Sequence, residues 1–94
     1  MSFARVVSFE GVTRERVAQL EREINEGDPP EGMPATEILM LHDPDAETSL
    51  VVVLFDTEED YATGDAILSA MPGGGTPGRR VAVTKYQVAI HRKL

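Results

Sequence analysis

The sequence predicts a small α+β domain with the element order β-α-β-β-α-β. Hydrophobic residues make up 41% of the 94-residue chain, which is enough for one modest core. Four segments have the residue pattern of strands, and helical patterns separate the first strand from the second and the third from the fourth. Stretches rich in proline and glycine mark several boundaries. We therefore expect residues 1–94 to form a single domain.

The N-terminal part is predicted to form a strand and then a helix. Residues 3–9 alternate in side-chain direction, with Phe3 and Val7 on one face of a strand. Thr13 is suited to cap a helix that ends at Gly27. The proline-containing segment 28–34 is predicted to be a loop. The apolar side chains of the helix recur at i, i+3 and i+7 and form one stripe: Val17, Leu20 and Ile24.

The middle of the chain is predicted to form a β-hairpin. Residues 36–42 and 48–55 are rich in residues that favour strands, and the second segment has the strongest strand pattern in the chain. Residues 43–46, Asp-Pro-Asp-Ala, have the composition of a tight turn. Because a short turn joins two strand patterns, we expect the strands to pair with each other.

The C-terminal part is predicted to form a helix and a last strand. Thr57 is suited to cap the helix, and the acidic residues after it favour a helix N-terminus. Residues 72–78 are predicted to be a loop and residues 80–91 a long strand. The apolar side of the helix contains Tyr61, Gly64, Ile67, Leu68 and Met71. A glycine within this stripe indicates a close approach of the helix to the sheet.

The two β-α-β units together predict a ferredoxin-like arrangement, with both helices on one face of a four-stranded antiparallel sheet. The central strands are apolar on both faces: in strand 48–55, Leu50 and Val52 oppose Val51 and Val53. Two helices can cover only one face, and an uncovered apolar face is larger than monomers usually expose. We therefore expect a homodimer, which has the commonest oligomeric symmetry. The alternative is a monomer with an exposed apolar sheet.

The last predicted strand adds a weaker indication of the same kind. Its apolar positions change parity along the strand, from Val81 and Val83 to Tyr86, Val88 and Ile90. A β-bulge, or a strand shared between two surroundings, would produce such a change.

Two segments, together with the element order, resemble a known family. Residues 55–60, Phe-Asp-Thr-Glu-Glu-Asp, open the second helix, and residues 83–89, Val-Thr-Lys-Tyr-Gln-Val-Ala, belong to the last strand. They resemble the dimeric α/β-barrel superfamily, which includes the antibiotic-biosynthesis-monooxygenase-like proteins. The resemblance implies that two sheets pack face to face into a barrel, with edge strands or termini exchanged. It also implies pockets between the helices and the sheet of each protomer.

The same resemblance bears on chemistry. Oxygenase members that work without a cofactor use an Asn, a Trp and nearby His, Tyr or Arg, and haem-degrading members use a helical His. This chain has no Trp, and its one asparagine, Asn25, lies at the end of the first predicted helix. His42 and His91 both fall on predicted strands. We therefore expect no cofactor, and whether the protein is an enzyme stays open.

Four residues are candidates for a ligand-binding site: Arg5, His42, Tyr61 and Tyr86. An arginine on an apolar strand face needs a partner, and a neutral imidazole at the end of an apolar strand can act as a general base. The tyrosines place phenols on apolar faces. If the four converge, they line an apolar pocket with a few polar groups. The alternative is ordinary core tyrosines, an arginine at a sheet margin and a histidine half in water or in a dimer contact.

Two other patterns favour plain loops. Residues 73–78 fit the G-x-G-x-x-G motif, but a helix precedes them and a strand follows, the reverse of a dinucleotide site. A small anion held by these amides with Arg79 and Arg80 is the weaker alternative. The acids Asp43, Asp45 and Glu47 lack the glycine and distal glutamate of a calcium loop, so we expect no metal site.

Composition excludes several classes of function. Without cysteine, the chain has no disulfides, thiol nucleophiles or zinc–thiolate sites. A net charge of −7 disfavours nucleic acid and anionic membranes as partners, and strand 48–55 lacks the basic and aromatic residues of an RNA-recognition domain. The N-terminus lacks a signal-peptide pattern, and the longest apolar run is far shorter than the ~20 residues of a membrane span. We expect a cytoplasmic protein.

Two functions remain. The favoured one is a dimeric barrel that binds, or weakly converts, a small apolar or aromatic ligand. The alternative is a non-catalytic dimerisation or accessory module. An amino-acid-binding regulatory module has a similar topology, but such modules usually accompany a larger enzyme.

Overall fold

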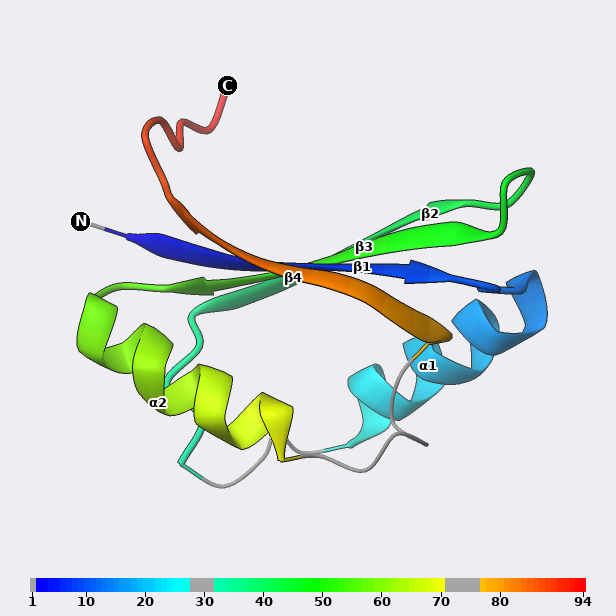
Figure 1. The fold of residues 1–94 in the computed structure, drawn as a ribbon, viewed down its shortest axis with the longest axis horizontal. Helices are drawn as coiled ribbons and strands as arrows, with labels where there is room; N and C mark the ends of the chain where they lie inside the picture. Colours follow the sequence, from blue (N-terminus) through cyan, green and yellow to red (C-terminus); the bar gives the residue numbers. More distant parts are fainter. Residues whose placement is uncertain (1, 28–31, 71–76) are drawn as a thin grey trace.

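The computed structural model describes residues 2–27, 32–70 and 77–94 and confirms the predicted element order (Figure 1). The strands form one antiparallel sheet in the order β2-β3-β1-β4, which is the ferredoxin-like arrangement. The elements are β1 Phe3–Glu10, α1 Arg14–Glu26, β2 Glu37–Asp43, β3 Thr48–Phe55, α2 Glu58–Ser69 and β4 Arg79–Gln87.

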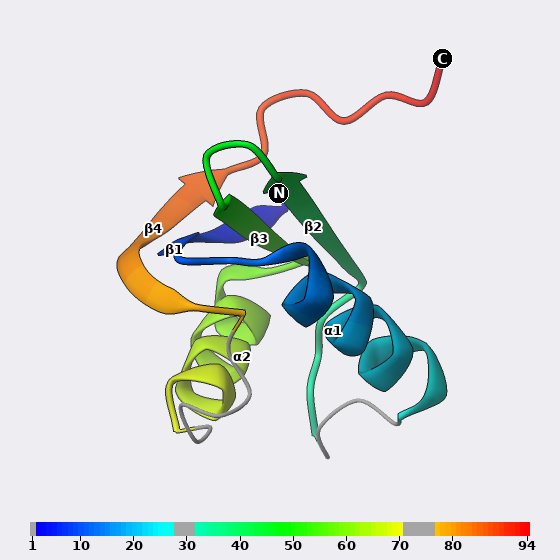
Figure 2. The same cartoon turned by 90° about the vertical axis from the view of Figure 1, so that its right-hand side faces the viewer.

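Both helices lie on one side of the sheet, here called the helix face, and the other side is the open face (Figures 1 and 2). The side chains of Val7 and Val53 lie on the helix face. Successive side chains of a strand point to opposite faces, so the residues before and after each valine lie on the open face. Directly opposite residues on paired strands share a face. The open face therefore includes Ala4, Val6, Ser8, Leu39, Leu41, Leu50, Val52, Leu54 and Tyr86.

The helices begin where the sequence predicts. The Thr13 hydroxyl accepts a hydrogen bond from the amide of Arg16 at 3.2 Å, and the Thr57 hydroxyl accepts one from Asp60 at 3.0 Å. Each threonine satisfies an amide that the helix itself leaves without a partner. These two caps fix where each helix leaves the preceding strand.

The hairpin between β2 and β3 is closed by the side chain of Asp43. Its carboxylate accepts hydrogen bonds from the amides of Asp45 at 3.1 Å and Ala46 at 3.2 Å. Such a side-chain turn competes with further strand pairing and reverses the chain. Of the three acids considered for a cation site, Asp43 thus acts in the turn.

The core lies between the helix face and the two helices, in two clusters. One cluster centres on Val7, Phe9 and Val12, and Val17 of α1 packs against it. The other centres on Val53, Phe55 and Tyr61 of α2. Phe55 and Tyr61 meet edge to face, with ring centroids 5.5 Å apart and planes at 70°. The clusters place α1 over one end of the sheet and α2 over the other, as Figure 1 shows.

The predicted strand 80–91 is too long at its C-terminal end. β4 ends at Gln87, which lies opposite Phe3, and the amide of Val88 then bonds the carbonyl of Ser2 at 2.8 Å. In the described sheet β4 is an edge strand that pairs with β1, and β1 begins at Phe3. Residues 88–94 therefore leave the sheet on its open side (Figure 1), and His91 is not in a strand.

A bulge does occur in β4, but earlier than the change of parity. The register against β1 shifts between Ser8 and Phe9, so that Val81 is the extra residue. The strand enters this region past Gly78, where a Cβ atom would collide with the carbonyl oxygen of Glu10. Glycine is required there because the two backbones approach so closely.

Parts of the predicted loops lie outside the described residues. These are residues 28–31 of the first loop and 72–76 of the second, which include most of the glycine motif and its amides. Met71 of the predicted helix stripe lies outside them too.

Candidate functional site

A groove on the helix face separates α1 from β2. Its volume is about 240 Å³. The walls are mainly apolar and come from the inner side of α1 and the helix-face side of β2. The lining residues are Val17, Glu21, Ile24, Asn25, Ile38, Met40 and His42.

The groove exists because α1 covers β2 incompletely. Leu20 in the middle of the helix is buried, with 6% of its surface exposed, but Ile24 one turn later is 47% exposed. Ile38, at the start of β2, is 53% exposed although it lies on the helix face. Two isoleucines therefore line the groove without being covered, which is the kind of apolar surface that a small ligand can bury.

His42 ends the row of β2 side chains that line this groove. Its Nε2 lies 3.0 Å from the carbonyl oxygen of Val12. A carbonyl can only accept a hydrogen bond, so Nε2 is the nitrogen that carries the proton. Across the strand pair, His42 lies opposite Ser49, whose buried hydroxyl has no hydrogen-bond partner within the part of the chain that the structure describes. His42 is thus the one imidazole of the described residues that borders this groove.

Arg5 occupies a different place, beneath α2. Its Nε donates to Oδ1 of Asp65 at 2.8 Å, and only 4% of its surface is exposed. β1 is an internal strand, so Arg5 is not at a sheet margin as the alternative interpretation held. Nη2 of this guanidinium is buried and finds no hydrogen-bond partner among the described residues. Burying a charged group is costly unless it is paired, and Asp65 supplies the pairing charge.

Tyr61 lies near Arg5 and its partner Asp65, and both charges act on its phenol. The Lys85 amine is 5.0 Å from the centre of the Tyr61 ring and 5.1 Å from that of Phe3, a cation–π arrangement. Burial raises the pKa of the Tyr61 phenol above its ordinary value of 10.0, and the Asp65 carboxylate raises it further. Arg5 and Lys85 act on this pKa in the opposite direction. The phenol is therefore held in its neutral form.

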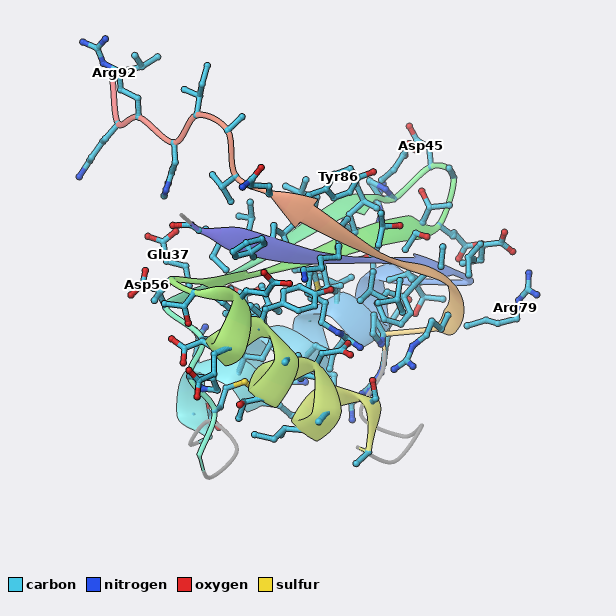
Figure 3. All side chains as sticks on the ribbon, turned by 60° about the vertical axis from the view of Figure 1, so that its left-hand side comes forward. Glu37, Asp45, Asp56, Arg79, Tyr86 and Arg92 are labelled. Carbon is cyan, nitrogen blue, oxygen red and sulfur yellow. The ribbon has the colours of Figure 1, made fainter. Side chains whose placement is uncertain are left out.

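Tyr86 lies on the other side of the sheet. It is opposite Ala4 in the β1–β4 pairing and is 55% exposed. Figure 3 shows it on the side away from the helices. A sheet therefore separates Tyr86 from the groove and from Arg5.

The four candidate residues thus fall in three places. The structure brings Arg5 and Tyr61 together, leaves His42 at the groove and puts Tyr86 on the open face. Asp65 was missed, although it stands four residues after Tyr61, on the same side of the helix. An acid within an otherwise apolar stripe was the signal that could have found it. Glu21 and Asn25 were missed as groove residues, although both are neighbours of the Val17–Ile24 stripe on a helix surface.

The open face has a hollow of its own, of about 410 Å³, near the β2–β3 turn. Leu41 and Leu50, which are paired across β2 and β3, form part of its wall together with Ser8 and Val81. Leu41 is 48% exposed and Leu50 is 40% exposed. Leucines are normally buried, so this side of the sheet is apolar and uncovered in one protomer.

Among residues 2–27, 32–70 and 77–94, no three or more potential metal-ligating side chains gather closely enough to hold an ion. Neither described helix has the length and hydropathy that crossing a bilayer requires.

Comparison with known proteins identifies the fold. No protein-family model matches the chain, and no curated protein matches it. Among solved structures it is similar to the crystal structure of a "putative Antibiotic biosynthesis monooxygenase" from Chloroflexus aurantiacus J-10-fl. The TM-score is 0.60, the sequence identity is 16%, and the match covers 98% of both chains. The chain has the same ferredoxin-like fold over nearly its whole length, as the predicted resemblance implied, and this level of identity speaks for the fold alone.

Proposed function

We propose that this protein is a homodimer in which each protomer binds a small apolar ligand in the groove between α1 and β2. The observation that carries the ligand proposal is the groove itself: four apolar side chains surround a cavity of about 240 Å³ with one imidazole at its end. Ligand sites are typically apolar clefts with a small number of polar groups that fix orientation.

The dimer proposal rests on the open face. Leu39, Leu41, Leu50 and Tyr86 are each at least 40% exposed on one side of the sheet. Packing two such faces together would remove this apolar surface from water. Each Å² of apolar surface buried contributes about 25 cal/mol of favourable free energy. The groove is on the helix face, so pairing through the open face leaves it accessible. Dimerisation and ligand binding are therefore compatible.

The solved structure supports this proposal through its description. That protein is described as a "putative Antibiotic biosynthesis monooxygenase", and it shares this fold over 98% of its chain. The residues of the present chain favour binding of an apolar molecule and do not assign a reaction. Conversion of the ligand is therefore not part of the proposal.

The test is an NMR titration of the ¹⁵N-labelled protein with a library of neutral one-ring compounds. We expect binding to shift the amide signals of Val17, Ile24, Ile38 and Met40 and to leave those of α2 unchanged. Ile38→Lys places a charge on the groove wall and is expected to weaken binding about tenfold or more. Ala62→Lys, at an exposed position of α2, is the matched control and is expected to bind as the wild type does.

Two outcomes would contradict the proposal. If no compound shifts groove signals, the groove is not a ligand site. A dimer without ligand binding would then favour the accessory module, for which the open face alone provides a reason. If compounds bind but shift α2 signals, the ligand site lies beneath α2, near Arg5 and Tyr61.

A further inference from the structure

The imidazole of His42 has one hydrogen-bonding atom left for a ligand. Nε2 donates to the carbonyl oxygen of Val12 at 3.0 Å, so a neutral ring has its lone pair on Nδ1. No other hydrogen bond or ion pair of the His42 side chain occurs among the described residues. Nδ1 is therefore an acceptor without a donor, on a ring that borders the groove.

Val12 holds this tautomer in place. Its side chain is fully buried, and its own amide donates to the carbonyl of Glu47 at 2.7 Å. With the side chain packed in the core and the amide bonded, the Val12 carbonyl cannot easily turn away from the ring. A hydrogen bond at one ring nitrogen sets the role of the other nitrogen. The fold thus presents an acceptor, and not a donor, at the end of the groove.

The charges around the groove select against anions. Of the seven described residues that line it, Glu21 is the one that carries a formal charge, and it is negative. The chain as a whole carries −7. A carboxylate in this apolar groove would lose hydration, would meet Glu21 and would find no hydrogen-bond donor at Nδ1 of a neutral ring.

The volume of this open groove indicates the size of the apolar body that it can hold. A cavity of ~150 Å³ is known to hold benzene. The groove volume of about 240 Å³ therefore suits one ring with one or two small substituents.

We propose that the ligand is a neutral one-ring compound that donates a hydrogen bond, from a hydroxyl or N–H group, to Nδ1 of His42. This inference rests on the proposed function, since it concerns the same groove. It adds the chemical class of the ligand: an apolar body, one donor and no negative charge.

The experiment compares three probes of similar size by NMR titration: 4-methylphenol, its methyl ether 4-methylanisole, and 4-methylbenzoate. One net hydrogen bond corresponds to an affinity difference of about three- to tenfold. We expect the phenol to bind the wild-type groove more tightly than the ether by this factor, and the carboxylate to bind most weakly. In His42→Phe, which keeps an aromatic ring without an acceptor, phenol and ether should bind equally. His91→Phe is the control and should keep the wild-type preference.

A second measurement needs no ligand. Long-range ¹H–¹⁵N spectra of the ring should show a protonated Nε2 and an unprotonated Nδ1 for His42 in the neutral state. The proposal is overturned if the proton is on Nδ1, or if ether and phenol bind the wild type equally well. Equal binding at the groove would leave the proposed function intact, whereas the absence of groove shifts with all three probes would overturn both.

Discussion

Gly64 of α2 lies directly against the ring of Phe55 in β3, so closely that a Cβ atom at this position would overlap ring carbons. The glycine that interrupts the apolar stripe of the helix thus allows the close approach predicted from the sequence. Phe55 is fully buried beneath it, at the centre of one of the two core clusters.

Gly64→Ala is therefore expected to destabilise the protein although alanine favours helices. The gain in helix propensity is about 1 kcal/mol, whereas forcing an extra carbon into a packed core costs about 1–3 kcal/mol. We expect a net loss of up to about 2 kcal/mol in the free energy of unfolding, measured by urea denaturation. Thr63→Ala, at the neighbouring exposed position, should change it by less than about 0.5 kcal/mol. A Gly64→Ala protein as stable as the wild type would show that Phe55 can move aside.

Leu41→Lys is expected to weaken the proposed dimer. The substitution places a charge on the open face, close to the β2–β3 turn, where pairing through this face would desolvate it. Sedimentation at micromolar concentration should show a dimer for the wild type and a dissociation constant raised about tenfold or more for the variant. Ile24→Lys changes an equally exposed apolar residue on α1 and should leave the dimer intact. A wild-type protein that sediments as a monomer would contradict the pairing itself.

Asp65→Ala removes the partner of the buried Arg5 guanidinium. Breaking a buried pair costs about 3–5 kcal/mol, but Asp65 is 42% exposed, so we expect a loss of about 2 kcal/mol in the free energy of unfolding. The double variant Arg5→Met/Asp65→Ala should recover most of this loss, because no charge is then left buried. Glu58→Ala, which removes an exposed ion pair with Lys85, serves as the control and should cost less than about 1 kcal/mol. If the free-energy losses of the single variants Arg5→Met and Asp65→Ala add up to that of the double variant, the two side chains do not interact.

The raised pKa of Tyr61 predicts a loss of stability in strong alkali. An acid whose pKa is higher in the folded state keeps its proton there at a pH where the unfolded chain has lost it. Stability from this group is complete below the unfolded value of about 10 and is lost as the pH rises through the folded value. Phenolate absorbance, taken as the difference between wild type and Tyr61→Phe, should have a midpoint above pH 10. The variant should also lose less stability than the wild type above this pH, and a midpoint at or below 10 would contradict the burial of the phenol.

Local signals were sufficient to predict most of the fold. Thr13 and Thr57 marked both helix starts, and the turn at Asp43 marked the hairpin, because each depends on residues within a few positions of one another. The end of β4 could not be predicted in this way. It depends on where β1 stops offering partners, and β1 lies more than 70 residues away in the sequence.

The candidate site was harder to predict for the same reason. The bond from Arg5 to Asp65 joins positions 60 residues apart. The groove exists because α1 leaves Ile38 uncovered, and a helical stripe shows which side of a helix is apolar without showing how far it reaches over the sheet. That His42 shares a strand face with Ile38 and Met40, in contrast, follows from strand alternation alone.

The Val12 amide can report local opening beside the groove. Its amide and its carbonyl are both bonded to the β2–β3 hairpin, through Glu47 and His42, so the turn that leads into α1 is fastened to the strands opposite. Deuterium can replace the Val12 amide proton only when the hydrogen bond from this amide to Glu47 opens. The rate of deuterium uptake at that single position would therefore report how often the turn before α1 separates from the β2–β3 hairpin, with or without a bound ligand.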